Sequence, residues 1–190
     1  MNAKHLIWGL TAASLLAFAP AGVAGTDGEQ HAAAQHVGSS ASTFPAAVRK
    51  ATERFLDLDD AIAAGYGIFQ GCVSGPEEGA MGVHYVKPAL FDDRLEVENP
   101  EALVYEPKNG RLHLVAVEYI TPAAAWQGSH AAGVQPDLRG HLFHFAPGPN
   151  RYGPDAFFEL HVWAWKDNPR GTFADWNPEV SCAGWRGTSQ

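Results

Sequence analysis

The segment LVYEPKNGRLHLVAVEY, residues 103–119, contains the strongest structural signal in the chain, an Asn109-Gly110 pair between two apolar runs. Asn and Gly tolerate the positive φ angles of a tight turn, and this pair is the strongest short-range signal for a β-hairpin. We therefore expect antiparallel strands over 103–106 and 112–119. The predicted loop has two or four residues.

The predicted hairpin places one acidic side chain in an apolar setting. Either loop length puts Leu103 and Tyr105 on one face with Leu114 and Ala116, and Glu118 then falls on the same face. A buried carboxylate without a partner costs several kcal/mol, so Glu118 needs a cation, a metal ion or a bound proton. The alternative is that Glu118 lies at the wet edge of the sheet.

Other short apolar segments favour strands on both sides of the hairpin, over 81–86, 141–145 and 157–165. Pro- and Gly-rich segments at 121–140 and 146–155 are expected to form loops. Several short strands with long loops are typical of an antiparallel sheet.

A single helical pattern precedes the strands. Apolar residues recur at the three- and four-residue spacing of one helical face: Phe44, Val48, Ala51, Phe55, Leu58 and Ile62. Thr43 is the expected N-cap, and a break at which Asp57 caps a second short helix is the alternative. The sequence thus predicts an α+β fold, with one N-terminal helix packed on an antiparallel sheet or partly open barrel.

The N-terminal residues predict export. Lys4, an apolar run at 5–19 and small residues near a cleavage point make 1–25 a predicted signal peptide, with an uncleaved anchor as the alternative. Residues 26–42 are expected to be a flexible leader, and 43–190 a single globular domain. We expect a periplasmic or secreted protein that is not inserted in a membrane after cleavage.

The chain has two cysteines, Cys72 and Cys182. In an oxidising compartment such a pair is most simply a disulfide. Two thiolate metal ligands or a redox pair are the alternative, but the chain lacks a C-x-x-C motif.

The charge balance excludes some partners. Lys and Arg number 13 against 21 Asp and Glu, for a formal net charge of −8. This argues against nucleic acid and against anionic membrane surfaces. Familiar catalytic motifs such as G-x-S-x-G and H-E-x-x-H are absent, so whether the protein is an enzyme stays open and no catalytic residue is predicted. The oligomeric state is not predicted either.

A candidate site emerges from the segment FELHVWAW, residues 158–165. In a strand, Glu159 and His161 share one face. Together with His84 and Glu118 they form a possible ligand set for a divalent ion such as Zn, Cu, Fe or Mn. The alternative for each histidine is a half-buried residue bonded to the backbone.

Aromatic residues suggest a second possibility. Trp163 and Trp165 would lie on the same face as His161 and, with Tyr85, line a small-molecule or carbohydrate site. The alternative is that they belong to the core. A third hypothesis is a structural envelope protein in which the histidines and glutamates satisfy each other.

Several blocks carry a resemblance to a family. These are GAMGVHYV at 79–86, PEALVYEP at 100–107, ELHVWAWKDNP at 159–169 and WNPEVSC at 176–182. They resemble a family of uncharacterised exported bacterial proteins. The resemblance implies membership and export, and it transfers no catalytic residue.

Overall fold

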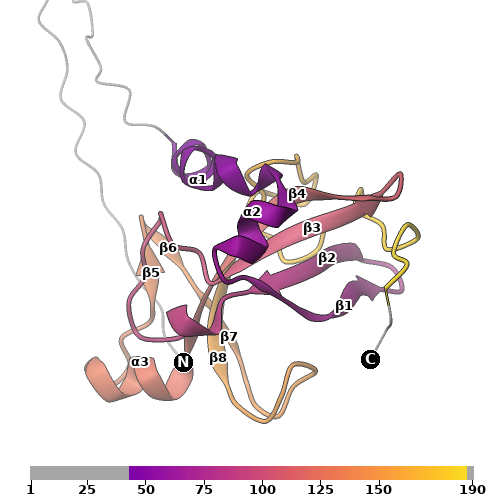
Figure 1. Cartoon of the computed structure of the whole chain (residues 1–190). Coiled ribbons are helices and arrows are strands. Elements are labelled where there is room, and N and C mark those ends of the chain that lie inside the picture. Colours follow the sequence, from indigo (N-terminus) through magenta and orange to yellow (C-terminus); the bar gives the residue numbers. More distant parts are fainter. Residues whose placement is uncertain (1–42, 188–190) are drawn as a thin grey trace, which may run out of the picture. The chain divides into compact units, whose positions relative to one another are not determined.

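Six antiparallel strands form a strongly curled half-barrel in the computed structural model, and short helices pack against it (Figure 1). The structure describes residues 43–187. The predicted signal peptide at 1–25 and the predicted leader at 26–42 lie outside the described residues. Within them the α+β prediction is confirmed.

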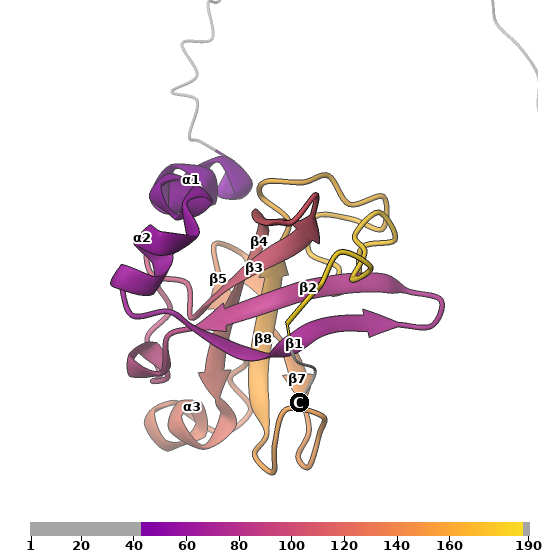
Figure 2. The ribbon, with the colours of Figure 1, turned by 45° about the vertical axis from the view of Figure 1, so that its right-hand side comes forward.

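The helices are α1 (Phe44–Thr52), α2 (Leu58–Ala63) and α3 (Ala123–Ser129), with single 3-10 turns at Glu53–Leu56 and Pro88–Leu90. The strands are β1 (Gly67–Gly75), β2 (Gly79–Val86), β3 (Ala102–Lys108), β4 (Arg111–Pro122), β5 (Asp137–Leu138), β6 (His141–Leu142), β7 (His144–Ala146) and β8 (Phe157–Val162). The main sheet has the order β1-β2-β3-β4-β8-β7, and β5 pairs with β6 separately. Because the sheet curls, β1 and β2 run across the direction of β7 and β8 (Figure 2).

The β3–β4 hairpin is confirmed, with Asn109 and Gly110 as a two-residue turn at φ angles of 53° and 74°. The predicted faces hold for Leu114, which lies with Leu103 and Tyr105, but they are wrong for Ala116 and Glu118. A register shift between Val104 and Tyr105 leaves Val115 as an extra residue on β4. This bulge moves Glu118 to the face opposite Tyr105.

One face of the sheet packs against α1 and α2. The fully buried rings of Tyr105 and Tyr119 lie in this core, and the Tyr105 hydroxyl donates to the backbone oxygen of Phe55 at 2.8 Å. Buried phenols need such partners, because an unpaired hydroxyl would cost free energy.

The expected N-terminal helix is broken, as the alternative proposed. The side chain of Asp57 accepts a hydrogen bond from the Asp59 amide at 3.0 Å and caps α2. The break changes the helical phase, so Ala61 is fully buried while Ile62 is 51% exposed. Helix α3 lies in the segment that was expected to be a loop, and β1 was not predicted; three consecutive alanines favour α3.

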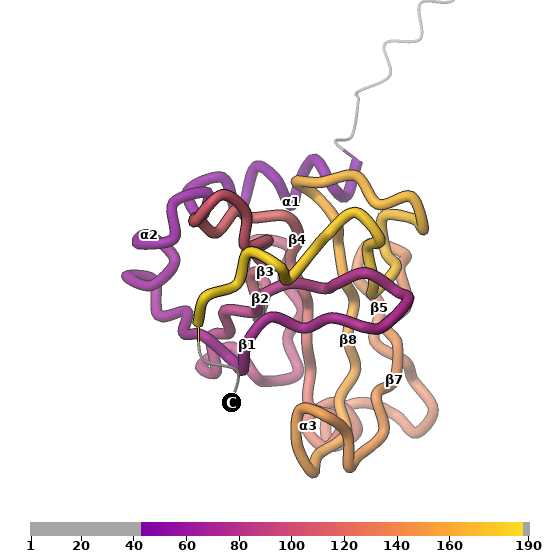
Figure 3. The backbone as a smooth tube through the Cα atoms, turned by 90° about the vertical axis from the view of Figure 1, so that its right-hand side faces the viewer, coloured from indigo at the N-terminus to yellow at the C-terminus, as the bar shows by residue number. Residues whose placement is uncertain are grey.

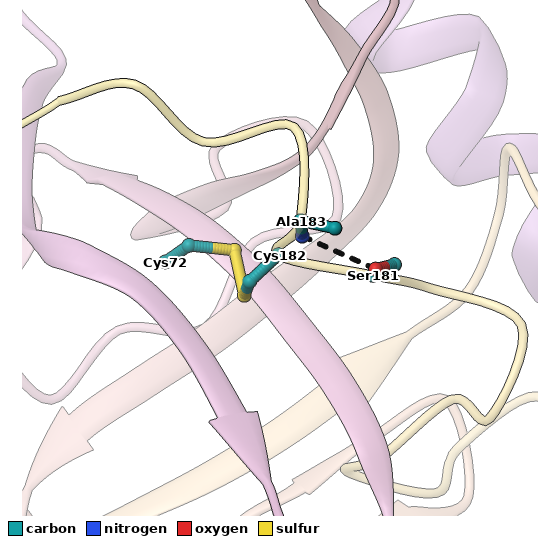
Figure 4. Close-up of a disulfide and its surroundings, with 4 residues drawn as sticks. All are labelled: Cys72, Ser181, Cys182 and Ala183. Atoms are coloured by element: carbon teal, nitrogen blue, oxygen red, sulfur yellow. Dashed lines mark hydrogen bonds between the residues drawn. A yellow bond between two sulfur atoms is a disulfide. The ribbon is translucent and has the colours of Figure 1, made fainter.

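The residues after β8 return to the other end of the sheet. Asn177 forms a backbone bridge with Ala80, beside β2 (Figure 3). The predicted disulfide is confirmed: Cys72 on β1 is bonded to Cys182, 110 residues later (Figure 4). Among residues 43–187, no helix combines the length and hydropathy needed to cross a bilayer.

Candidate metal centre

Three strands bring His84, Glu118 and His161 together on the face of the sheet opposite α1 and α2. Glu118 on β4 and His161 on β8 are direct cross-strand partners. His84 on β2 reaches them across β3, which contributes only Ala102 and Val104 to this face near the site. Small and medium-sized side chains on the intervening strand leave room for the longer ones to meet.

The three side chains are close without being hydrogen-bonded. His84 Nε2 lies 3.5 Å from Glu118 Oε2, and His161 Nδ1 lies 3.8 Å from Glu118 Oε1. One ligand atom from each residue falls within 4.8 Å of the others. A charge-assisted N–H···O bond would close to about 2.8 Å. The two histidines therefore do not satisfy the carboxylate.

Because these side chains are buried, polar atoms left without hydrogen-bond partners cost free energy of folding. His84, Glu118 and His161 are 5%, 5% and 1% exposed. The Nδ1 atom of His84 and both ring nitrogens of His161 have no hydrogen-bond partner among the described residues. Buried polar atoms are normally paired, so such a concentration of unpaired nitrogens calls for a ligand.

The electrostatics favour neutral ligands. Burial lowers the pKa of His84 to about 4, and burial with the nearby His84 ring lowers the pKa of His161 to about 3. Burial, reinforced by the neighbouring Glu159 carboxyl group, raises the pKa of Glu118 well above its usual value. At neutral pH the metal-free site thus presents two uncharged imidazoles, beside a carboxyl group whose raised pKa favours its protonated form.

Glu159, the fourth predicted ligand, lies beside this group but is not one of the three. It is 8% exposed, and its Oε2 has no hydrogen-bond partner within residues 43–187. Burial raises its pKa as well. On its other side is β7, where its cross-strand partner His144 lies 3.3 Å from Asp175. Glu159 is therefore placed to adjust the charge of the centre from outside the ligand set.

A pocket of about 250 Å³ opens onto the centre, with His84 and Glu118 in its lining. Its other walls are mostly apolar and come from the strands, from the loop that joins β2 to β3 and from the loop that follows β7. They are formed by Phe69, Val86, Phe91, Ile120, Pro122, Tyr152, Gly153, Pro154, Asp155, Ala156 and Phe157. No local pattern marks these residues, because only the curl of the sheet brings β1 and the two loops together.

The predicted aromatic ligand residues lie elsewhere, and none of them lines this pocket. Trp163 is buried beside His161, with ring centroids 6.1 Å apart, and donates to the backbone oxygen of Ala174. Trp165 belongs to the helix-covered core and donates to Thr52. Tyr85 also faces that core.

Strand β8 ends too early for the side-chain alternation predicted over residues 158–165 to continue as far as Trp165. β8 stops at Val162, and the amide of Ala164 donates to the backbone oxygen of Val162, which turns the chain. Trp165 consequently leaves the face that carries His161.

Comparisons with protein-family models, with curated proteins and with solved structures found no match for this chain. Membership of the exported bacterial family stays a prediction.

Proposed function

We propose that the protein binds a divalent transition-metal ion through His84, Glu118 and His161. The observation that carries this is the close group of three buried side chains in which both ring nitrogens of His161 and Nδ1 of His84 lack hydrogen-bond partners among the described residues. Two ligand atoms that are each ~2.1 Å from one tetrahedral ion lie ~3.4 Å apart. The 3.5 Å between His84 Nε2 and Glu118 Oε2 is close to that spacing, and one ligand atom from each of the three residues lies within 4.8 Å of the others. The three side chains would therefore have to close slightly around an ion.

The donor set narrows the choice of ion. Two imidazoles and one carboxylate occur in catalytic zinc sites and in non-haem iron(II) sites, and both leave coordination positions open. Here the open side lies toward the pocket, which His84 and Glu118 both line. Such an ion would act as a Lewis acid on a small molecule in the pocket. Copper and manganese remain to be distinguished by the metal analysis.

The two rival functions receive less support. A purely structural His–Glu network would show hydrogen bonds from both histidines to Glu118, yet those two separations are too long. Glu118 instead interacts with the neighbouring Glu159 carboxyl group, and His161 keeps both ring nitrogens unpaired. A tryptophan platform for sugars would require an exposed indole, and the large apolar side chains exposed within residues 43–187 include no tryptophan.

The test is the metal content of the protein without a His tag. The protein is dialysed against a buffer that contains trace amounts of divalent metal ions, and its bound metal is then measured by mass spectrometry. We expect about one ion per chain in the wild type. His84→Ala/His161→Ala should lose it and stay folded. His113→Ala is the matched control, because His113 is exposed on the same strand as Glu118. A metal-free wild type that takes up no added ion would refute the proposal.

We also propose that the protein is periplasmic or secreted. The disulfide between Cys72 and Cys182 supports this, because such bonds form and persist in oxidising compartments. Fractionation of cells that produce the full chain, with N-terminal sequencing of the product, tests it. A reduced, unprocessed chain in the cytoplasm would contradict it.

A further inference from the structure

The pocket above the proposed metal centre has an unusual lining for so small a space. Four of its walls are aromatic rings, from Phe69, Phe91, Tyr152 and Phe157. Phe69 and Phe91 are 37% and 40% exposed although they are large and apolar. Apolar side chains that gather around a concave site mark a place where a ligand is bound.

We infer that this pocket binds a one-ring aromatic molecule with a single oxygen donor, an alkylphenol being the simplest example. Its ring lies among the aromatic walls, and its oxygen points toward His84 and Glu118. This inference rests on the proposed function, because the oxygen would ligate the bound ion.

The volume sets the size of the ligand. A cavity of ~150 Å³ holds benzene, and ordinary small-molecule pockets begin at ~300 Å³. The pocket here, at about 250 Å³, lies between these values. One ring with a short substituent fits that space, whereas a nucleotide or an oligosaccharide does not.

The side chains of the lining supply no positive charge of their own. The titratable groups that line the pocket are His84, Glu118, Tyr152 and Asp155, and neither Lys nor Arg is among them. Apart from the proposed ion, the pocket therefore has no cation to pair with a phosphate or a sulfonate. The chain's formal net charge of −8 also disfavours the approach of an anionic ligand.

The polar contacts of the walls also favour an aromatic ligand. The Tyr152 hydroxyl is engaged with the sulfur of Met81 at 3.4 Å, so the residue offers mainly its ring. Edge-to-face or offset contacts between aromatic rings each add ~1 kcal/mol beyond the burial of apolar area. A second ring fits among these walls better than a polar group.

The experiment titrates zinc-loaded protein with 4-methylphenol by calorimetry, after the zinc content of each sample has been measured. Toluene is the matched ligand without the oxygen. Phe91→Asp places a charge in the pocket wall. Ile62→Asp is its control, since Ile62 is a comparably exposed residue on α2 outside the pocket lining. We expect 4-methylphenol to bind at least tenfold more tightly than toluene, and Phe91→Asp alone to weaken it at least tenfold.

The outcomes separate this inference from the metal assignment. Zinc-loaded wild type that binds no 4-methylphenol contradicts the inference alone. Equal affinities for 4-methylphenol and toluene, or equal affinities in Phe91→Asp and Ile62→Asp, also overturn it. A wild type that takes up neither zinc nor any other added divalent ion contradicts the proposed function, and the inference falls with it.

Discussion

Glu118 and His161 lie directly opposite each other on β4 and β8, yet Glu118 Oε1 and His161 Nδ1 are 3.8 Å apart. Facing residues on adjacent strands can easily close to hydrogen-bonding distance, because their Cβ atoms are only ~5 Å apart. The pair is therefore spaced for an ion between the two groups and not for a shared proton. His84 completes the same arrangement from β2.

Glu118→Gln should separate function from stability. The amide keeps the shape of the side chain but needs no charge, so removing a buried ionisable group without a cationic partner should leave metal-free stability within ~1 kcal/mol of the wild type. Metal affinity should fall at least ~100-fold, because the anionic ligand is lost. Urea unfolding and metal titration measure the two effects. A large loss of metal-free stability would instead identify Glu118 as a structural residue.

Metal binding should release a proton from the carboxyl groups. With pKa values of about 4 for His84 and about 3 for His161, both imidazoles are already neutral above pH ~5. The raised pKa of Glu118 means that its proton must leave when the ion binds. Affinity should consequently rise with pH by up to ~tenfold per unit below that pKa. Calorimetry in buffers of different ionisation enthalpy counts the protons. Zinc binding that releases no proton, with an affinity that does not change with pH, would contradict this prediction.

Glu101 should make the stability fall with rising pH. It is 1% exposed, and burial raises its pKa to about 8, although its Oε2 accepts a hydrogen bond from the Ile120 amide. Between the ordinary glutamate pKa of 4.5 and a pH of about 8, the folded protein holds this proton and the unfolded chain does not. The contribution of Glu101 to the free energy of unfolding is therefore fully present at low pH. It is lost as the pH rises from about 4.5 to about 8. Glu101→Gln can keep the hydrogen bond without titrating.

The measurement is the free energy of unfolding of wild type and Glu101→Gln at pH about 5 and about 8. The variant should gain at least ~1 kcal/mol relative to the wild type at the higher pH. Two pH profiles that run parallel would show that Glu101 is ionised in the folded protein.

Local signals predicted those parts of the fold and site that depend on one strand or one turn. Asn109-Gly110 predicted the hairpin, and alternation placed Glu159 and His161 on one face, because turns and pleats are properties of neighbouring residues. The bulge at Val115 depends on how β4 pairs with β3, and no single segment carries that information. The face of Glu118 was accordingly wrong.

The approach of His84 to Glu118 is a tertiary effect. It requires the order β2-β3-β4, the curl of the sheet and a small residue such as Ala102 between the two side chains. Phe69 and Phe91 join the pocket for the same reason. Sequence spacing could propose the ligand types, but only strand order shows that they meet.

Trp163 should report the bound ion. Its ring centroid is 6.1 Å from that of His161, so a paramagnetic ion such as Cu²⁺ at the site would quench its fluorescence at short range. Cu²⁺ should quench the wild type at one equivalent, and Trp163→Phe should lose most of that effect. Trp126→Phe is the control, because Trp126 packs in the other core cluster. Equal quenching in both variants would place the ion elsewhere.

The disulfide should stabilise the fold without shaping the metal centre. Cys72 and Cys182 are separated by 110 residues, and none of the three proposed ligands forms a hydrogen bond or an ion pair with either cysteine. The chain-entropy model gives ~4–5 kcal/mol for closing a loop of this size. Cys72→Ala/Cys182→Ala should lower the free energy of unfolding by about that amount in urea. Metal affinity, measured below the unfolding transition, should change less than ~threefold. The reason is that the ligands lie on strands held in place by backbone hydrogen bonds to neighbouring strands. A variant that stays folded yet loses the ion would show that the bond positions β2.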